Sequence, residues 1–79
     1  MIKEFDPVVL NADLPEHYLR VGDIGTVVLI YQDRAGYEVE FVALDGETVA
    51  VISLHADQVR PISHGEIAHA RRVEQPLAA

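Results

Sequence analysis

Hydrophobic positions along this chain either alternate with polar ones or form short β-branched runs, and Gly, Pro, Asn and Asp separate these stretches. The pattern predicts strands over residues 5–10, 23–32, 36–43, 48–54 and 59–62. Alternation is clearest in the third strand, which places Tyr37, Val39 and Phe41 on one face. Glu38 and Glu40 fall on the other face. We expect the apolar face of this strand to lie in the core.

The second predicted strand begins with two glycines three positions apart, Gly22 and Gly25, and continues into the longest β-branched apolar run of the chain. Gly22 followed by Asp23 indicates a tight turn at the start of the strand. A glycine inside a strand usually marks a bulge or a sharp bend, so we expect one at Gly25. A bend of this kind is how a small barrel turns its corners.

Residues 11–20 connect the first two predicted strands and are too many for a hairpin turn and too few for a crossover helix. We expect a folded surface arm that Leu14 and Leu19 pin to the core. Asp13 precedes Leu-Pro-Glu and is predicted to cap one short helical turn. A second short turn, over residues 55–58, is expected to be a 3₁₀ turn ahead of the last strand.

Two tight hairpins are predicted between the central strands. Residues 33–36 form the first, with Gly36 at its left-handed position. Asp45 and Gly46 lie at the centre of the second, and an Asp-Gly pair between two strands favours a type I′ turn. Hairpins of this kind make neighbouring strands antiparallel.

Five short antiparallel strands, one long arm and a 3₁₀ turn before the last strand predict an all-β fold, a five-stranded SH3-like barrel. An OB-type barrel is the alternative, but that fold inserts a helix where this chain has an Asp-Gly hairpin. Residues 1–62 are predicted to form the barrel and residues 63–79 a C-terminal tail. At 79 residues the chain makes one small domain.

The tail is predicted to carry a short helix at about residues 64–74 or to be flexible. Ser63 and Glu66 have the spacing of a capping box, and Pro76 would end the helix. A helix of about ten residues is marginal without tertiary packing. Its apolar stripe is thin, so the helix has two alternatives: it packs on the barrel, or it frays.

Acidic residues outnumber basic ones, 13 to 6, which gives the chain a net charge of −7. The imbalance lies in residues 1–62, which hold four basic and eleven acidic residues. An acidic surface repels phosphate backbones and attracts basic partners, so we expect no nucleic-acid partner. The alternative is that the charge serves only to keep a small protein in solution.

Cysteine is absent, which fits a reducing compartment and excludes a thiolate site. No apolar run reaches the roughly 18 residues that span a membrane. Glu4 stands near the N-terminus, where a signal peptide would be apolar. We therefore expect a cytoplasmic protein without a membrane partner.

The residue types that carry chemistry are present without a catalytic or metal-binding motif. The four histidines, His17, His55, His64 and His69, do not have ligand spacing, and surface positions are the better interpretation. Carboxylates on one face of a strand are typical of a solvated face rather than of an acid–base pair in a cleft. We predict no catalytic residue, no metal, no cofactor and no enzymatic activity.

The outer face of the third and fourth predicted strands is the candidate interface, because apolar side chains there are rimmed by acidic ones. Its residues are Glu38, Glu40, Val42, Glu47, Val49 and Val51. The fourth strand is apolar on both faces, so the sequence alone does not fix which of its residues face water. The alternatives are that the tail helix covers the valines or that they pack inside the barrel.

Six motifs along residues 2–62 occur in the order seen in one small bacterial family. They are Val8-Val-Leu10, Asp13-Leu-Pro-Glu-His17, Gly22-Asp-Ile-Gly-Thr-Val-Val28, Tyr37-Glu-Val-Glu-Phe41, Asp45-Gly-Glu-Thr48 and Gln58-Val-Arg-Pro61. The chain resembles that family, which is catalogued as a domain of unknown function and is frequent in cyanobacteria. The resemblance implies an SH3-type barrel, similar in outline to the β-subunit domain of nitrile hydratases. It implies no catalytic residues, and it says nothing about the tail.

These observations favour a non-catalytic acidic protein-binding module. Its partner would be another protein with a basic surface, and a homo-oligomer also stays open. One such role is that of an antitoxin or immunity-type partner that neutralises a basic protein such as a nuclease. The alternative is an accessory domain of an enzyme complex, by analogy with the nitrile hydratase β-subunit.

Overall fold

Five antiparallel strands form a single sheet in the computed structural model of the chain, which describes residues 1–73. The strands are β1 (Pro7–Leu10), β2 (Ile24–Ile30), β3 (Gly36–Val42), β4 (Thr48–His55) and β5 (Val59–Pro61). Their order across the sheet is β4-β3-β2-β1-β5, and each neighbouring pair is antiparallel. The predicted all-β fold of five strands is confirmed.

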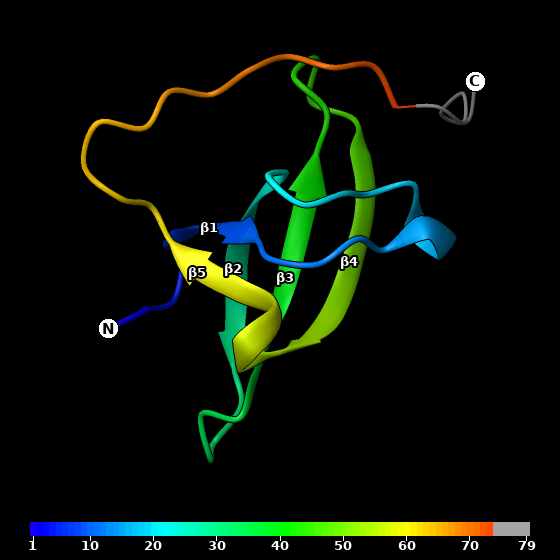
Figure 1. The fold of residues 1–79 in the computed structure, drawn as a ribbon. Helices are drawn as coiled ribbons and strands as arrows, with labels where there is room; N and C mark the ends of the chain where they lie inside the picture. The colour runs from blue at the N-terminus through cyan, green and yellow to red at the C-terminus, as the bar shows by residue number, and fades with distance from the viewer. Residues whose placement is uncertain (74–79) are drawn as a thin grey trace.

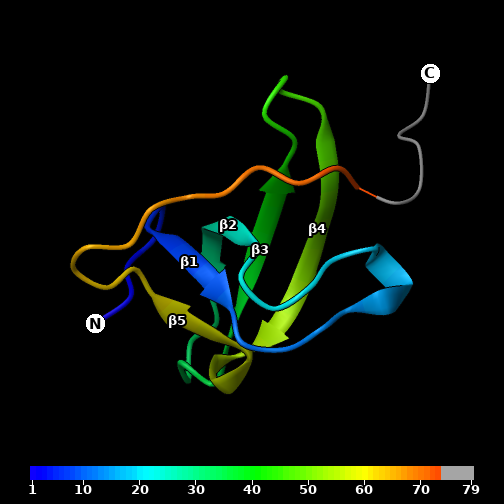
Figure 2. The same cartoon turned by 45° about the horizontal axis from the view of Figure 1, so that its top comes forward.

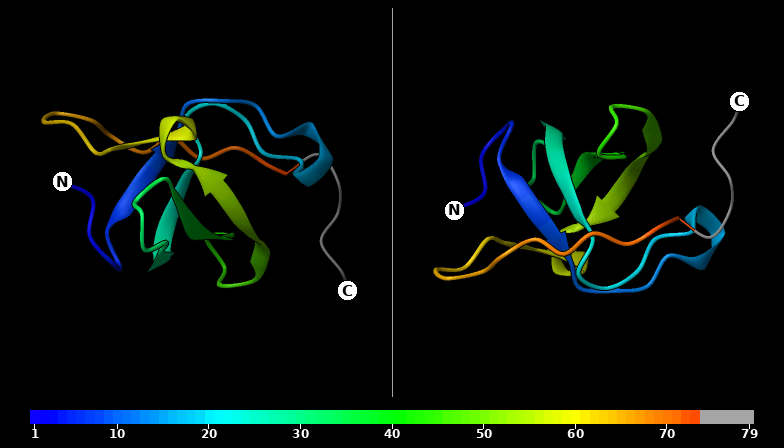
Figure 3. Two further views of the ribbon diagram at one scale, coloured as in Figure 1. Left: turned by 90° about the horizontal axis from the view of Figure 1, so that it is seen from below. Right: turned by 90° about the horizontal axis from the view of Figure 1, so that it is seen from above.

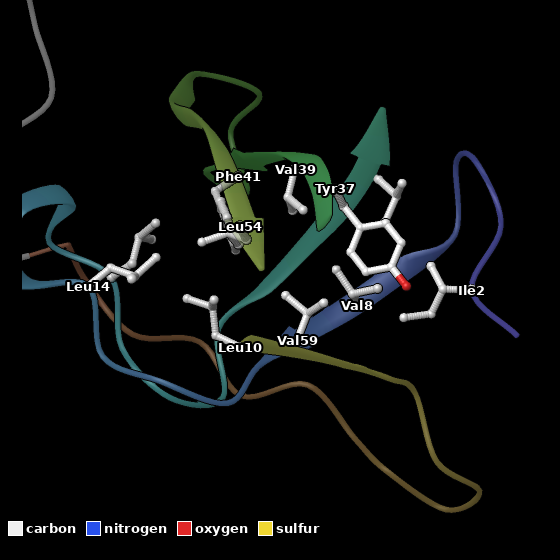
Figure 4. Packing of buried hydrophobic residues seen from close by; sticks show 11 residues of the cluster. Ile2, Val8, Leu10, Leu14, Tyr37, Val39, Phe41, Leu54 and Val59 are labelled. Carbon is white, nitrogen blue, oxygen red and sulfur yellow. The ribbon is translucent and has the colours of Figure 1, made fainter. Parts of the chain in front are cut away.

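The sheet is strongly curled and barrel-like, because the short strands β1 and β5 lie across one side of the longer strands β2, β3 and β4 (Figure 1, Figure 3). The core fills the space between these two groups of strands (Figure 4). Val8, Val27 and Val39 are fully buried there. Tyr37 and Phe41 are 7% and 2% exposed, which confirms that this face of β3 lies in the core.

Two strands carry an extra residue that bulges out of register, and neither residue is the predicted one. In β2 the pairing with β3 shifts between Val27 and Leu29, which leaves Val28 as the extra residue. In β4 the pairing shifts near the start of the strand and leaves Val49 as the extra residue. Gly25 stays in register with β1, so no bulge lies there, and the sharp bend that was the other expectation stays a prediction. A glycine occupies that position because β3 packs closely against it.

Both predicted hairpin turns take another form. In the β2–β3 hairpin the left-handed residue is Arg34, with φ 57°, and Gly36 already belongs to β3. The β3–β4 connection is residues 43–47, longer than a two-residue type I′ turn. Gly46 has a positive φ of 98°, whereas a type I′ turn needs a positive φ at Asp45 as well.

The arm between β1 and β2 closes on itself. Leu14 and Leu19 form an isolated bridge and both side chains are buried, so the prediction that they pin the arm is confirmed. A 3₁₀ turn, η1 (Pro15–His17), lies between them. The predicted cap at Asp13 is wrong, because Asp13 Oδ1 accepts a hydrogen bond from Val21 N at 2.9 Å instead.

The predicted 3₁₀ turn before the last strand is confirmed as η2 (Ala56–Gln58). His55 N donates to Gln58 Oε1 over 2.8 Å at the start of this turn. Both helical segments, η1 and η2, are three residues long. Along residues 1–73, therefore, no helix has the length and apolar character needed to cross a membrane.

The described part of the tail contains no helix, so the helix predicted at about residues 64–74 is wrong over residues 64–73. Gly65 adopts a positive φ of 82°, which a right-handed helix does not allow. Residue 74 and the predicted helix stop at Pro76 lie outside the described residues.

Two ion pairs fix the tail to the rest of the molecule. Glu66 accepts hydrogen bonds of 2.9 and 2.6 Å from the Arg60 guanidinium. It also accepts one of 2.6 Å from Ser63 N, so half of the predicted capping box forms without a helix. Further along, the Arg71 guanidinium forms a bidentate ion pair with Asp23. Figure 2 shows the tail crossing the molecule between these two anchors.

Candidate functional site

One side of strands β2, β3 and β4 is left uncovered by the described residues, because β1, β5, the arm and the tail lie on the other side (Figure 3). We call this uncovered side the outer face. Cross-strand partners point to the same side of a sheet, so the register defines its members. They include Thr26, Leu29, Glu38, Glu40, Val42, Thr48, Val51 and Ser53, together with Tyr31, whose hydroxyl donates to Glu38.

The register places two glutamates of β3 at the centre of the outer face. Glu38 lies between Leu29 of β2 and Ser53 of β4. Glu40 lies beside Val51 of β4, one row further along. Each carboxylate therefore has both polar and apolar side chains as close neighbours.

Hydroxyl groups hold the Glu38 carboxylate in place. Tyr31 Oη donates to Glu38 Oε2 at 2.6 Å, and Ser53 Oγ donates to the same oxygen at 2.7 Å. The two hydroxyl oxygens are 2.8 Å apart. Hydrogen bonds to the charged form lower the pKa of Glu38 below its usual value, first through Tyr31 and then through Ser53. Glu38 is thus an oriented negative charge at neutral pH.

Glu40 and three apolar side chains complete the outer face. Thr48 Oγ1 donates to Glu40 Oε2 at 3.2 Å, which orients the second carboxylate. Leu29, Val42 and Val51 are 46%, 45% and 52% exposed. Large exposed apolar side chains beside oriented carboxylates have the composition of an interface with a charged rim.

The structure brings four of the six predicted interface residues together on the outer face. These four are Glu38, Glu40, Val42 and Val51. Val49 leaves the face, because the bulge in β4 turns it toward the core, where it packs against buried residues. Glu47 lies in the connection between β3 and β4, beyond the ends of the strands.

The described tail does not cover these valines. The helix that would have covered them is absent from the described tail, and Ile67 of the tail is 93% exposed. The tail runs along the side of the molecule that carries the arm (Figure 2, Figure 3). No residue of the described tail therefore covers the outer face, which is accessible to a partner.

Five of these members of the outer face were not predicted as interface residues. They are Thr26, Leu29, Tyr31, Thr48 and Ser53. Ser53 carries a signal in the sequence, because it shares the alternation of Val51 along β4. Leu29, Tyr31 and Thr48 face outward because the bulges at Val28 and Val49 reverse the alternation of their strands. That reversal cannot be read from hydrophobic pattern alone.

A shallow open depression of about 630 Å³ lies beside this network, near the β2–β3 hairpin. Its walls include Tyr31, Ser53 and His55. The depression is therefore a wide extension of the outer face rather than an enclosed substrate site.

The histidines belong to three parts of the chain. His17 is in η1, His55 ends β4, and His64 and His69 are exposed on the tail. Among residues 1–73, no three His, Cys, Asp or Glu side chains lie close enough to hold a metal ion.

The fold and the outer face define a small all-β domain with an exposed acidic and apolar surface. Residues 4–61 match the model of the family described as Domain of unknown function (DUF4926), and the chain belongs to that family. The predicted membership of a domain family of unknown function is confirmed. The match ends with β5, so it covers the sheet and leaves out the tail. Comparison with curated proteins and comparison with solved structures each found no match.

Proposed function

We propose that the chain is an acidic protein-binding module that pairs with a basic protein through its outer face. The observation that carries this proposal is the pair of oriented carboxylates, Glu38 and Glu40, set among half-exposed apolar side chains. A carboxylate already held by hydroxyl groups loses little rotamer freedom when a guanidinium or ammonium group binds it. The outer face is thus arranged in advance for basic side chains.

The charge of the whole chain supports a basic partner. A net charge of −7 on 79 residues steers positively charged surfaces toward the molecule and raises the rate of encounter. The apolar side chains Leu29, Val42 and Val51 supply area whose burial stabilises the complex. Phosphate backbones are repelled by the same field, so we propose no nucleic-acid partner.

Within this class we propose an antitoxin or immunity-type role, in which the chain covers a basic protein such as a nuclease. A nuclease binds phosphate backbones with a positively charged surface, and an acidic domain complements that surface. The role needs no catalytic residue, cofactor or metal in this chain.

The second candidate is an accessory domain of an enzyme complex, similar to the β-subunit domain of nitrile hydratases. The order β4-β3-β2-β1-β5, the long arm after β1 and the 3₁₀ turn before β5 support an SH3-like barrel, on which this candidate depends. One fold serves many functions, so we rank this candidate second.

A pull-down from the native host tests the first candidate. The unchanged chain is compared with the double variant Glu38→Gln, Glu40→Gln. The control is Glu4→Gln, Glu16→Gln, which removes the same charge from two exposed residues outside the outer face. We expect one specific basic protein, captured by the unchanged chain and by the control but lost from the Glu38, Glu40 variant.

The binding should also weaken as salt concentration rises, because rim charges are screened. Capture of no specific protein, or equal capture by all three chains, would overturn the proposal. Specific capture of a metal-dependent hydratase or lyase subunit would favour the second candidate instead.

A further inference from the structure

β4 is a long edge strand that ends the sheet. Among residues 1–73 it pairs with β3 alone, and no described strand pairs with its free side. It spans Thr48–His55 and holds no Pro, Lys, Arg, Asp or Glu. The opposite edge, β5, is three residues long and carries Arg60 and Pro61, which discourage pairing. An edge with the length and composition of β4 accepts an added strand.

The register shows which backbone groups of β4 point to the free side. Ala56 N donates to Ala35 O at 2.8 Å, so these two residues are a hydrogen-bonded pair. The next pair, Gly36 and His55, is therefore a non-hydrogen-bonded one. In such a pair His55, which belongs to β4, directs its N–H away from β3. His55 N accordingly donates to Gln58 Oε1, at 2.8 Å, and not to β3.

The alternation continues along β4. Leu54, Ile52 and Ala50 direct their backbone groups toward β3. Val51 and Ser53, which lie between them, direct their N–H and C=O groups to the free side. The side chains of Val51 and Ser53 point onto the outer face. These two residues thus present both an open backbone edge and part of the candidate binding surface.

We infer that an extended segment of the basic partner adds to β4 as a further antiparallel strand, paired with Val51 and Ser53. This inference rests on the proposed function and specifies how the partner docks. Each residue pair of this type exchanges two backbone hydrogen bonds. The partner side chains opposite Val51 and Ser53 then lie on the outer face, in the rows of Glu40 and Glu38.

These rows determine which residue types the segment carries. β4 lies between the added strand and β3, so each basic residue of the partner is two strand spacings, about 10 Å, from the glutamate in its row. A long basic side chain and a glutamate side chain together span that distance. Val51 offers apolar surface to the stem of an Arg or Lys side chain that reaches Glu40. Ser53 is small and leaves room for a second basic side chain to reach Glu38. The segment therefore carries two basic residues two positions apart, separated by a β-branched residue.

A second copy of this chain is the other candidate occupant, and its charge argues against it. Pairing β4 with β4 would join the acidic rows of two molecules in one sheet, where like charges repel. β4 holds no Lys or Arg that could lie opposite Glu38 and Glu40. Charge complementarity thus favours a basic segment of another protein.

A synthetic peptide, acetyl-Thr-Val-Arg-Val-Arg-Val-Thr-amide, tests the inference on the full chain. Titration followed by amide NMR is expected to shift the signals of Val51 and Ser53. N-methylation of the two arginine nitrogens should weaken binding about tenfold or more, because it removes donors to β4. N-methylation of the last two valine nitrogens, which point away from β4, should leave affinity unchanged. Equal effects of the two modifications, or no binding of the parent peptide, would overturn the inference.

Variants of β4 test the same inference from the side of the protein. Val51→Pro removes the N–H that points to the free side, at an edge position where proline is tolerated. Val51→Thr keeps that N–H and the β-branched shape, and serves as the control. We expect Val51→Pro to bind the peptide about tenfold or more weakly and Val51→Thr to bind like the unchanged chain. Circular dichroism melts establish that both variants are folded.

The outcomes separate this inference from the proposed function. If Val51→Pro captures the host partner as well as the unchanged chain does, strand addition is wrong while the dependence on Glu38 and Glu40 stands. If the Glu38→Gln, Glu40→Gln variant captures the host partner as well as the unchanged chain does, the proposed function itself fails. If sedimentation shows that Val51→Pro abolishes a dimer of this chain, the occupant is a second copy and the inference is overturned.

Discussion

Gly25 of β2 lies against Val39 of β3 so closely that a Cβ atom added to Gly25 would be 2.6 Å from Val39 Cγ1. The same atom would be 2.8 Å from Phe41 Cε1. All three residues are buried. This glycine is therefore required by the close approach of two strands, and its backbone is not left-handed.

Gly25→Val is expected to lower the free energy of unfolding by more than about 2 kcal/mol, because the added side chain overpacks the core. Thr26→Val is the control, since Thr26 is the exposed neighbour and should change stability by no more than about 0.5 kcal/mol. Urea denaturation measures both. Similar small losses at the two positions would show that the core side chains around Gly25 rearrange to make room for the valine.

The two faces of β3 should respond differently to truncation. Phe41→Ala is expected to cost about 3–5 kcal/mol, because Phe41 is 2% exposed and a cavity would remain. Glu40→Ala should change stability by no more than about 0.5 kcal/mol, because Glu40 lies on the solvated side. Equal losses in denaturation experiments would mean that both faces of β3 are structural.

Removing the tyrosine hydroxyl should release Glu38. In Tyr31→Phe the pKa of Glu38 is expected to rise toward its ordinary value of 4.5, because the largest cause of its lowering is the Tyr31 hydrogen bond. Carbon-detected NMR of the side-chain carboxyl follows the titration. Tyr18→Phe, in the arm, is the control and should leave the pKa of Glu38 unchanged. An unchanged pKa in Tyr31→Phe would contradict the oriented carboxylate.

Acid should detach the tail from Arg60. Hydrogen bonds from Arg60 and then from Ser63 N lower the pKa of Glu66 from 4.5 to about 2. A lowered pKa stabilises the folded state above the unfolded value, and this contribution is lost as pH falls from about 4.5 to about 2. Glu66→Gln should therefore melt below the unchanged chain at neutral pH.

The difference in melting temperature between Glu66→Gln and the unchanged chain should shrink through that range and vanish near pH 2. Glu16→Gln, in the arm, removes the same charge and serves as the control. Its difference from the unchanged chain should not follow the titration of Glu66. A Glu66→Gln difference that stays constant with pH would show that the ion pair with Arg60 adds nothing to stability.

Most of the sheet could be predicted from the alternation of side chains. The pattern of Tyr37, Val39 and Phe41 placed β3 correctly, because one face of that strand is buried and the other is solvated. β4 could not be phased in the same way, since both of its faces are apolar. The bulge at Val49 determines which residues of β4 face the core and which face outward, and a bulge forms only through pairing with β3.

The turns and the tail were predicted less well, because tertiary contacts outweigh local preference there. Glu66 has the spacing of a capping residue and does bind Ser63 N, yet the Arg60 guanidinium donates to both oxygens of the same carboxylate. Gly65 then continues the chain in a conformation that no helix uses. The candidate site was predicted in part, since Glu38 and Glu40 follow from alternation. The hydroxyls that orient them lie on other strands.

The ion pair between Arg71 and Asp23 joins residues 48 positions apart, which bears on the order in which the molecule folds. Closing so long a loop is entropically costly, whereas the β2–β3 and β3–β4 hairpins close between near neighbours in the chain. The turn that carries Asp23 is held by its contacts with β1, since Leu10 N donates to Asp23 O and Gly22 N donates to Leu10 O, so we expect it to form together with the pairing of β1 and β2. Contacts that form after the folding transition state act on the unfolding rate alone. The tail is therefore expected to lengthen the lifetime of the folded sheet without changing how fast the sheet forms.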